Sequence, residues 1–201
     1  MKVTLISASS APLGVITAAA RVTRGKSPTQ DLPSDPELVK RLMVLGHDSV
    51  LEFAWFCFYV EGISRACLAQ LTRHRLFSFC VESQRHSVVD KDYVVPESIT
   101  KAGKEEEYRL LMDAIFDFYH GLIEKGVPVE DARYVLPNAT KVKLFVAGNL
   151  RAWRHFISLR SSPEAQWEIR ELARRVYEEL GKLEDVFIYQ LGGRYETCAQ
   201  T

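Results

Sequence analysis

Short apolar runs and longer amphipathic stretches occur together in this chain, which predicts strands combined with helices. Residues 3–8 form one apolar run, and residues 51–60 form another that is dense in aromatic side chains. Both are typical of strands in a largely buried sheet. A further strand is expected over residues 139–147, residues 86–95 are expected to be extended, and Gly62 is expected to end the strand before it.

Apolar residues spaced three and four apart predict helices in two parts of the chain. The longest spans residues 101–125, and another begins at Pro36 and carries Leu38, Leu42 and Leu45 on one side. Further helices are expected over residues 14–23, 63–74, 128–136, 149–160 and 163–183.

These elements predict an α/β protein of the α+β kind, with a central sheet and several long helices. We expect a single domain over residues 1–201, because no repeat, low-complexity segment or linker divides the chain. The patterns GxGxxG and GxxxxGK[ST] are both absent, so neither a Rossmann domain nor a Walker phosphate loop is expected.

Composition excludes several classes of protein. The chain has 201 residues, 47% hydrophobic and 26% charged, and its 26 Lys and Arg balance its 26 Asp and Glu. A disordered chain would have fewer apolar residues and a large net charge, and a nucleic-acid coat would be strongly basic. No run approaches the roughly 18 apolar residues of a membrane span, and the N-terminal segment resembles a strand more than a signal peptide. We therefore expect no membrane or nucleic-acid partner.

Cysteine usage indicates a reducing compartment. Cys57, Cys67, Cys80 and Cys198 form no CxxC pair, and three of them lie in apolar runs. Neither a structural zinc site nor a disulfide framework is expected from this spacing. We expect a cytoplasmic protein with reduced thiols and no metal, in which Cys80 is a small buried apolar residue.

The neutral total charge conceals two tracts that contain no acidic residue, residues 62–81 and 132–163. Such tracts are usually solvated helix faces, but here Arg73, His74 and Arg75 are flanked by apolar residues. The guanidinium fork matches the geometry of phosphate and carboxylate groups. The two tracts therefore favour sites for anions.

One arrangement that begins in the first tract resembles the signature of a known family. Arg73-His74-Arg75 is followed, after seven residues, by Ser83-Gln84-Arg85. This resembles the RHR-x7-S-x-R signature of the flavin-dependent thymidylate synthases. Further segments resemble the same family in the same order: GHDSVLEF at 46–53, ARYVLP at 132–137, NLR at 149–151, LR at 159–160 and AQWEIR at 165–170. The resemblance covers about residues 14–185.

The resemblance implies a homotetrameric enzyme that makes dTMP from dUMP. Methylene-tetrahydrofolate would supply the one-carbon unit, and NADPH would reduce a bound FAD. The family has its own α/β fold, in which FAD sites are built at subunit junctions and residues of neighbouring subunits share a site. It uses no cysteine nucleophile.

Matching the motifs residue by residue implies two sets of ligand contacts. The residues expected to contact FAD are His47, Ser49, Arg73, His74, Arg75, Val81, Asn149, Leu150, Arg151 and His155. The residues expected to line the dUMP site are Gln70, Leu71, Thr72, Arg73, Val81, Glu82, Ser83, Gln84, Arg85, Arg133 and Arg160.

Two residues are expected to take part in the reaction. Arg160 matches the position that promotes ionisation at a pyrimidine ring nitrogen, because a fixed cation there favours the anionic ring. Ser83, with Arg85 and Arg133, would hold the phosphate and sugar side and so orient the base over the flavin. No general base follows Ser83 at a fixed spacing, so hydrogen bonding is preferred over a nucleophilic role.

The sequence also departs from the family pattern. Val81 stands where Glu or Gln is frequent, Phe53 replaces a His, and His86 replaces a Tyr. Two alternatives therefore stay open. One is a nucleic-acid-binding module that uses the two basic tracts and binds in a salt-sensitive way. The other is a flavin- or nucleotide-binding relative that has lost synthase activity.

Overall fold

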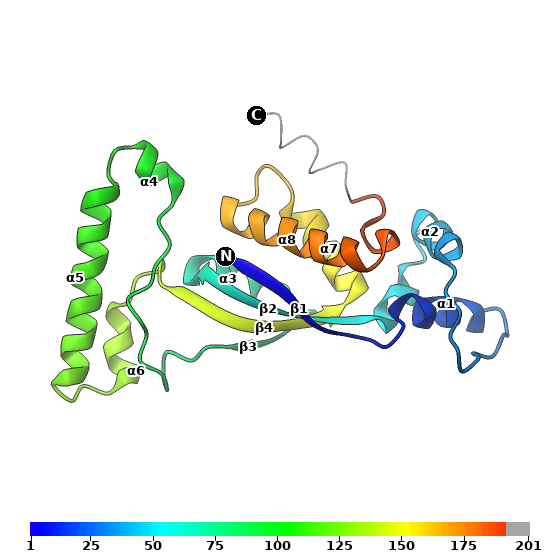
Figure 1. Cartoon of the computed structure of the whole chain (residues 1–201), viewed down its shortest axis with the longest axis horizontal. Coiled ribbons are helices and arrows are strands. Elements are labelled where there is room, and N and C mark those ends of the chain that lie inside the picture. The colour runs from blue at the N-terminus through cyan, green and yellow to red at the C-terminus, as the bar shows by residue number, and fades with distance from the viewer. Residues whose placement is uncertain (192–201) are drawn as a thin grey trace.

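The computed structural model describes residues 1–191 (Figure 1). Its centre is a four-stranded antiparallel sheet in the order β1-β2-β4-β3. The strands are β1 (Lys2–Ala8), β2 (Trp55–Ser64), β3 (Ser78–Val81) and β4 (Lys141–Asn149). The expected α+β class with a central sheet is confirmed. The expected domain end and Cys198 lie outside the described residues.

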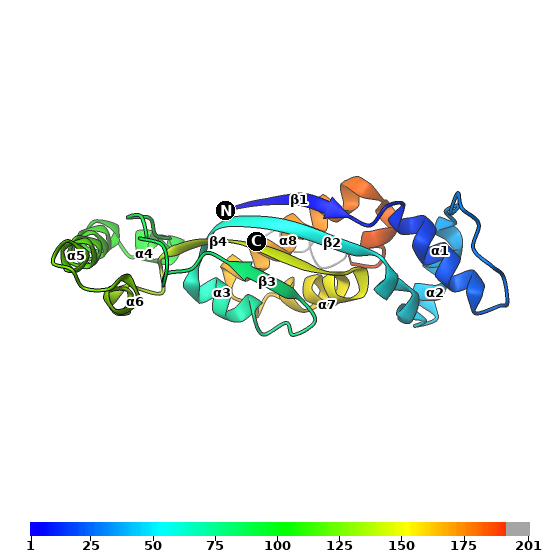
Figure 2. The ribbon, with the colours of Figure 1, turned by 90° about the horizontal axis from the view of Figure 1, so that it is seen from below.

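Helices cover one face of the sheet and extend beyond both of its ends (Figure 1). They are α1 (Pro12–Val22), α2 (Pro36–Val44), α3 (Arg65–Leu71), α4 (Glu97–Lys101), α5 (Glu105–Glu124), α6 (Val129–Ala132), α7 (Leu150–Arg160) and α8 (Trp167–Leu183). Short 3₁₀ turns occur at η1 (Asp48–Phe53), η2 (Arg133–Val135) and η3 (Asp185–Ile188). Helices α1 and α2 lie beyond one end of the sheet, and α4, α5 and α6 lie beyond the other (Figures 1 and 2).

The two faces of the sheet differ in burial. Phe56, Phe58 and Val60 alternate along β2 and are buried, because α3, α7 and α8 pack over this face (Figure 1). On the opposite face, the side chains of Trp55 and Phe145 are 48% and 43% exposed. The sheet therefore supports one core and leaves aromatic residues on its other side uncovered within the chain.

Two expectations about β2 are wrong, and both failures have a physical reason. The residues up to Phe53 form the η1 turn, so the strand begins only at Trp55. Gly62 does not end the strand. It takes a φ of 75° at a β-bulge between Glu61 and Ile63, and the strand continues to Ser64. Glycine tolerates this conformation because it has no Cβ.

Several other boundaries also differ from expectation. The helix expected over 101–125 is two helices, α4 and α5, separated at Gly103, whose φ is 68°. The helix expected from residue 163 begins at Trp167, because Gln166 caps it by accepting hydrogen bonds from the N–H groups of Glu168 and Ile169. The short strand β3 was not predicted from the sequence. Within residues 86–95, Tyr93 makes an isolated bridge to Thr140.

Candidate functional site

The turn after α3 and one face of α7 enclose a cavity of about 320 Å³. It is lined by Arg73, His74, Arg75, Leu76, Phe77, Ala152, His155, Leu159 and Arg160. Helix α3 ends at Leu71, so the Arg73–Arg75 segment lies in the turn that leads into β3. The structure thus brings together the family-like signature and the second basic tract, which are far apart in the sequence.

An N-cap fixes where helix α7 begins, and this determines which of its residues line the cavity. The side chain of Asn149 accepts a hydrogen bond from the N–H of Ala152 over 2.9 Å, as an N-cap does. One turn further on, His155 shares the face of Ala152 and lines the cavity. Arg151 forms an ion pair with Glu52 of η1 over 2.5 Å. Asn149 and Leu150 therefore have structural roles in placing α7, and Leu150 is buried.

Arg160 and His74 are in direct contact in this cavity. The Nε of Arg160 donates a hydrogen bond to Nε2 of His74 over 3.0 Å, and its Nη2 donates to the carbonyl oxygen of Gln70 over 3.4 Å. Burial, and then the charges of Arg160 and His155, lower the pKa of His74 to about 4. His74 is therefore neutral at pH 7 and able to accept a proton in a hydrogen bond.

This contact leaves the charge of Arg160 uncompensated. Neither of its hydrogen-bond partners is anionic, and no carboxylate lies within ion-pair distance of it among residues 1–191. A fixed cation in a half-enclosed cavity is suited to stabilise negative charge on a bound molecule. The geometry therefore fits the ionising role that the sequence assigns to Arg160.

An aromatic wall supports the imidazole of His74. Its ring centroid lies 5.0 Å from that of Phe156 and 5.9 Å from that of Phe77, and Phe77 lies 4.2 Å from Trp153. Gly148 permits this packing, because a Cβ there would lie only 2.4 Å from the Phe77 ring. Aromatic rings beside the cations Arg73, Arg75 and Arg160 form a lining that fits a planar, anionic group such as FAD.

The remaining residues expected at dUMP gather at the far end of β3. Ser83 accepts a hydrogen bond from the N–H of Arg85 over 3.2 Å. Arg85 pairs with Glu130 over 2.5 Å, and Arg133 donates to the backbone oxygen of Glu130 over 3.0 Å. Two guanidinium groups and a hydroxyl therefore converge on one place. Such a set of donors fits a phosphate group.

The expected dUMP residues thus fall into two groups within one chain. Gln70 and Arg73 precede β3 and lie near Arg160 of α7, which bonds to Gln70, whereas Ser83 and Arg85 follow β3. The extended strand separates Phe77 from Glu82 by about 16 Å, at about 3.3 Å for each residue.

The other residues expected at dUMP have contacts within the chain. Leu71 is buried, Thr72 caps α3, and Val81 pairs with Leu144. Glu82 pairs with Lys143, and Gln84 lies in the loop after β3.

His47 and Ser49, both expected at FAD, lie away from the cavity around His74 and from the Ser83–Arg85 loop. His47 and Ser49 line another cavity, of about 650 Å³, between α1, α2 and η1. The ion pair between Arg151 and Glu52 joins η1 to the start of α7. The contact between η1 and α7 therefore links elements that line this cavity and the one around His74.

Arg65 was not among the expected site residues, although it lies in the first acid-free tract. Its Nη2 donates to the carbonyl oxygen of Glu82 over 3.1 Å, while its Nε is buried without a partner in the described chain. Burial lowers the pKa of Arg65, the charge of Glu82 raises it, and the charge of Arg133 lowers it. Arg65 thus adds a third guanidinium beside the Ser83–Arg85 loop. The only sequence feature that points to Arg65 as a site residue is its position in the acid-free tract 62–81.

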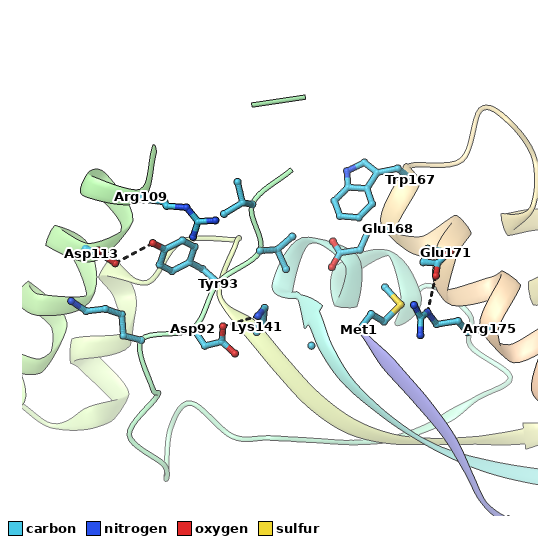
Figure 3. Close-up of a pocket in the computed structure, with 14 residues that line it drawn as sticks. Met1, Asp92, Tyr93, Arg109, Asp113, Lys141, Trp167, Glu168, Glu171 and Arg175 are labelled. Atoms are coloured by element: carbon cyan, nitrogen blue, oxygen red, sulfur yellow. Dashed lines mark hydrogen bonds and ion pairs between the residues drawn. The ribbon is translucent and has the colours of Figure 1, made fainter. Parts of the chain in front are cut away.

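A further cavity of about 590 Å³ contains none of the expected residues (Figure 3). Tyr93 and Asp113 lie on one side, and Trp167, Glu168 and Glu171 lie on the other (Figure 3). Its charges are largely engaged: Asp92 pairs with Lys141 over 2.7 Å and Arg175 with Glu171 over 2.7 Å, and Asp113 accepts a hydrogen bond from the hydroxyl of Tyr93 over 3.1 Å. These pairs explain the charged lining without a ligand.

Glu168 gives the family-like AQWEIR segment a structural role. Its carboxylate is buried and accepts hydrogen bonds from the backbone N–H of Ser64 over 2.7 Å and from its hydroxyl over 2.5 Å. Ser64 in turn caps α3 by accepting from the N–H of Cys67. Glu168 therefore fixes the start of the helix that carries Gln70.

The cysteines differ in burial within the described residues. Cys67 is buried, and burial raises the pKa of its thiol, whereas Cys80 is exposed, against expectation. Cys80 is exposed because its side chain points to the open face of the sheet edge formed by β3. Within residues 1–191, no group of His, Cys, Asp or Glu residues is arranged to hold a metal ion. No helix in the same range is long and apolar enough to cross a membrane.

Comparisons with known proteins agree on one family. The family described as "Thymidylate synthase complementing protein" matches residues 4–184. The flavin-dependent thymidylate synthase of Pyrococcus furiosus is 40% identical over 198 residues, which cover 92% of this chain and 81% of that protein. The one of Geobacter sulfurreducens is 40% identical over 186 residues, which cover 86% and 79%.

Solved structures give the same answer. A flavin-dependent thymidylate synthase from Helicobacter pylori, complexed with FAD and dUMP, matches with a TM-score of 0.76 and 26% identity over 93% of this chain and 98% of that one. A UMP/dUMP methylase from Streptomyces cacaoi, bound with 5-Br dUMP, matches with a TM-score of 0.80 and 26% identity over 92% of each chain. On these matches of sequence and fold, the chain belongs to the flavin-dependent thymidylate synthase family.

Proposed function

We propose that this protein methylates dUMP to dTMP, with methylene-tetrahydrofolate as the one-carbon donor and NADPH as the reductant through bound FAD. The observation that carries the proposal is the contact between Arg160 and a neutral His74 in a cavity with an aromatic wall. The uncompensated charge of Arg160 supports the proposal, because such a charge would stabilise an anionic pyrimidine ring. The membership of the chain in the family supports the same reaction.

We assign the residues of the chain separate roles in binding dUMP and in catalysis. Arg160 stabilises the ionised ring nitrogen of the uracil and so makes the base ready to accept a hydride. Ser83, Arg85 and Arg133 bind the phosphate and sugar side, and Gln70 and Arg73 complete the dUMP site. Bound FAD supplies hydride transfer between NADPH and the base.

The residues that would hold FAD lie around the turn after α3 and the start of α7. Arg73 and Arg75 are exposed, so their guanidinium groups are available for phosphate. His74 and His155 are placed to contact the ring system, while Arg151 and Asn149 contribute from the helix start. Val81 lies in β3, so its contact with a ligand would run through the backbone.

We propose a homotetramer with shared active sites. The separation of about 16 Å along β3, at about 3.3 Å for each residue, supports a dUMP site to which more than one chain contributes. The uncovered sheet face supports association as well, because Trp55 and Phe145 are large and about half exposed. Light scattering is expected to give four times the chain mass of 22.9 kDa. A stable monomer that is fully active would contradict the shared site.

A cytoplasmic location, a single domain over residues 1–201 and the absence of a nucleic-acid partner complete the proposal. The likeness to a UMP/dUMP methylase favours one variation, in which UMP is also a substrate. UMP and dUMP differ in the 2′-hydroxyl of the sugar, so the residues that contact the sugar decide which nucleotide is accepted.

The experiment starts with purified protein and added FAD. We expect a yellow protein with a shifted flavin spectrum, and oxidation of the reduced flavin that depends on dUMP. The same assay with UMP tests the variation. Protein that stays colourless with saturating FAD, or flavin oxidation that ignores both nucleotides, would refute the proposal. A yellow protein whose reduced flavin is not oxidised would indicate the alternative function, a flavin-binding protein without synthase activity.

A further inference from the structure

Glu168 is a buried carboxylate without a cationic partner in the described part of the chain. It is 2% exposed, and among residues 1–191 no Lys, Arg or His lies within ion-pair distance of it. Its oxygens accept hydrogen bonds from the N–H and the hydroxyl of Ser64. Burying a charge in this way costs free energy, and Ser64 alone can cap α3 through the N–H of Cys67. The capping of α3 therefore does not require a carboxylate at this place.

Helix α3 connects this carboxylate to the guanidinium of Arg160. Ser64 stands at the start of the helix, and Gln70 lies six residues further on, about 9 Å away at about 1.5 Å for each residue. The carbonyl oxygen of Gln70 accepts a hydrogen bond from Nη2 of Arg160 over 3.4 Å. A displacement of α3 along its axis would therefore move an acceptor that holds Arg160.

His74, the second partner of Arg160, depends on the same helix. The N–H of Arg73 donates to the carbonyl oxygen of Gln70 over 3.3 Å, and the N–H of His74 donates to that of Leu71 over 3.1 Å. The turn that carries His74 is thus attached to the last carbonyl groups of α3. The imidazole and the Gln70 carbonyl, which both accept from the Arg160 guanidinium, therefore move with this helix.

Both charged groups act on the thiol of Cys67, which is fully buried on α3. Burial raises the pKa of Cys67, the negative charge of Glu168 raises it as well, and the positive charge of Arg160 lowers it. Charges interact strongly where water is excluded. Glu168 and Arg160 therefore both lie close to the same buried segment of α3.

We propose that Glu168 is a positioning residue for Arg160 and acts through helix α3. Its carboxylate accepts both donors of Ser64, which fixes α3 along its axis and so holds the Gln70 carbonyl and His74 at the guanidinium. Glu168 takes no direct part in the reaction. The inference rests on the proposed function, in which Arg160 stabilises the ionised pyrimidine ring.

Three variants of the full-length protein test this role. Glu168→Gln keeps the volume of the side chain, but its amide offers one acceptor oxygen for the two donors of Ser64. Ser64→Ala removes the hydroxyl that joins Glu168 to Cys67, and it carries the same test if Glu168→Gln does not fold. Val176→Ala is the matched control, because it truncates a buried side chain on α8 and leaves the Glu168 carboxylate in place.

The first measurement is the kinetics of dTMP formation. Glu168→Gln and Ser64→Ala are expected to lower kcat by about 10- to 100-fold, because a misplacement of about 1 Å can have an effect of this size. The KM for dUMP is expected to stay within about threefold, since Arg85 and Arg133 bind the phosphate from the other group of residues. In the Arg160→Ala background, Glu168→Gln is expected to lower kcat by less than about twofold more, because its effect runs through Arg160.

The second measurement needs no turnover. NMR titration of the histidine C–H resonances follows the pKa of His74, and His74→Gln assigns its signal. Burial, and then the charges of Arg160 and His155, hold this pKa at about 4. In Glu168→Gln the guanidinium is released from its position, so the pKa is expected to rise toward 6.5. In Val176→Ala it is expected to stay near 4.

Three outcomes would overturn the inference. One is an equal loss of kcat in Val176→Ala, which would indicate a general effect of destabilisation. Another is that the losses of Glu168→Gln and Arg160→Ala multiply in the double variant, and a third is an unchanged pKa of His74 in both Glu168→Gln and Ser64→Ala. Failure of the proposed function is a different result: the unsubstituted protein would form no dTMP, and the pKa of His74 would still decide this inference.

Discussion

The Nε of Arg160 donates a hydrogen bond to Nε2 of His74 over 3.0 Å, so a neutral imidazole orients this guanidinium. A carboxylate in the same place would have neutralised the charge. An imidazole with a pKa lowered to about 4 fixes the direction of the cation and leaves its charge for the substrate. This pair therefore combines positioning with electrostatic strength.

The first prediction concerns Arg160 itself. Arg160→Ala is expected to lower kcat for dTMP formation by about 100-fold or more, because a donor directed at developing charge is lost. FAD binding is expected to change little, which fluorescence titration checks. Arg160→Lys keeps the charge without the fork and is expected to retain more activity. A kcat within threefold of the unsubstituted enzyme in Arg160→Ala would refute the role of this residue.

The second prediction is a pH dependence of stability due to His74. Its pKa is about 4 in the folded protein and 6.5 in the reference state, so the unfolded chain binds the proton more readily. His74 therefore contributes full stability above about pH 6.5, and this contribution is lost as the pH falls toward 4. Because the ring is only half-buried and partly screened, the expected loss is about 1–2 kcal/mol.

The measurement is urea denaturation at pH 7 and at pH 5, compared with the variant His74→Gln. Glutamine accepts the hydrogen bond of Arg160 but does not titrate in this range. The variant is expected to lose less stability between the two pH values than the unsubstituted protein. Identical losses in both proteins would show that His74 is not the group responsible.

The third prediction concerns the Ser83–Arg85 loop. Arg85→Ala is expected to raise the KM for dUMP by about 10- to 100-fold, through loss of a charged hydrogen bond to phosphate. Glu130→Gln is expected to act in the opposite direction, because Glu130 holds the Arg85 guanidinium in the free chain. An exposed ion pair contributes about 0.2–1 kcal/mol, so the KM is expected to fall by about 1.5- to 5-fold. Steady-state kinetics with varied dUMP tests both variants. Equal increases in KM would show that Glu130 and the phosphate of dUMP do not compete for Arg85.

The fourth prediction separates stability from function at Arg65. Arg65→Met removes a buried Nε that has no partner in the described chain. We expect the free energy of unfolding to change by less than about 1 kcal/mol, because the lost bond to Glu82 and the relieved burial of charge oppose each other. The KM for dUMP is expected to rise about tenfold. A large loss of stability with an unchanged KM would show a purely structural role.

Much of the secondary structure was predictable, because local signals and tertiary packing agree. Apolar periodicity indicated α2 and α5, and the aromatic run indicated β2. Gly62 misled the prediction, since a glycine signals either a break or a bulge, and only the pairing of β2 with β4 decides which. The short strand β3 was missed because its pairing with β4, rather than its own composition, makes it a strand.

The candidate site was predictable residue by residue, but its arrangement was not. The signature named Arg73–Arg75 and Ser83–Arg85 without showing that β3 holds them apart. The contact between Arg160 and His74 joins residues 86 positions apart, which no local pattern reveals. For α2, the periodicity of Leu38, Leu42 and Leu45 predicted a helix but could not show that this face lines a cavity.

The most direct test of the account is the conversion of dUMP itself. Purified protein is incubated with FAD, NADPH, methylene-tetrahydrofolate and dUMP, and the nucleotides are identified by mass spectrometry, with Arg160→Ala in parallel. We predict dTMP in the unsubstituted reaction, its dependence on every component, and a yield lower by about 100-fold in the variant. The absence of dTMP from FAD-loaded protein, or equal yields from both proteins, would contradict the account.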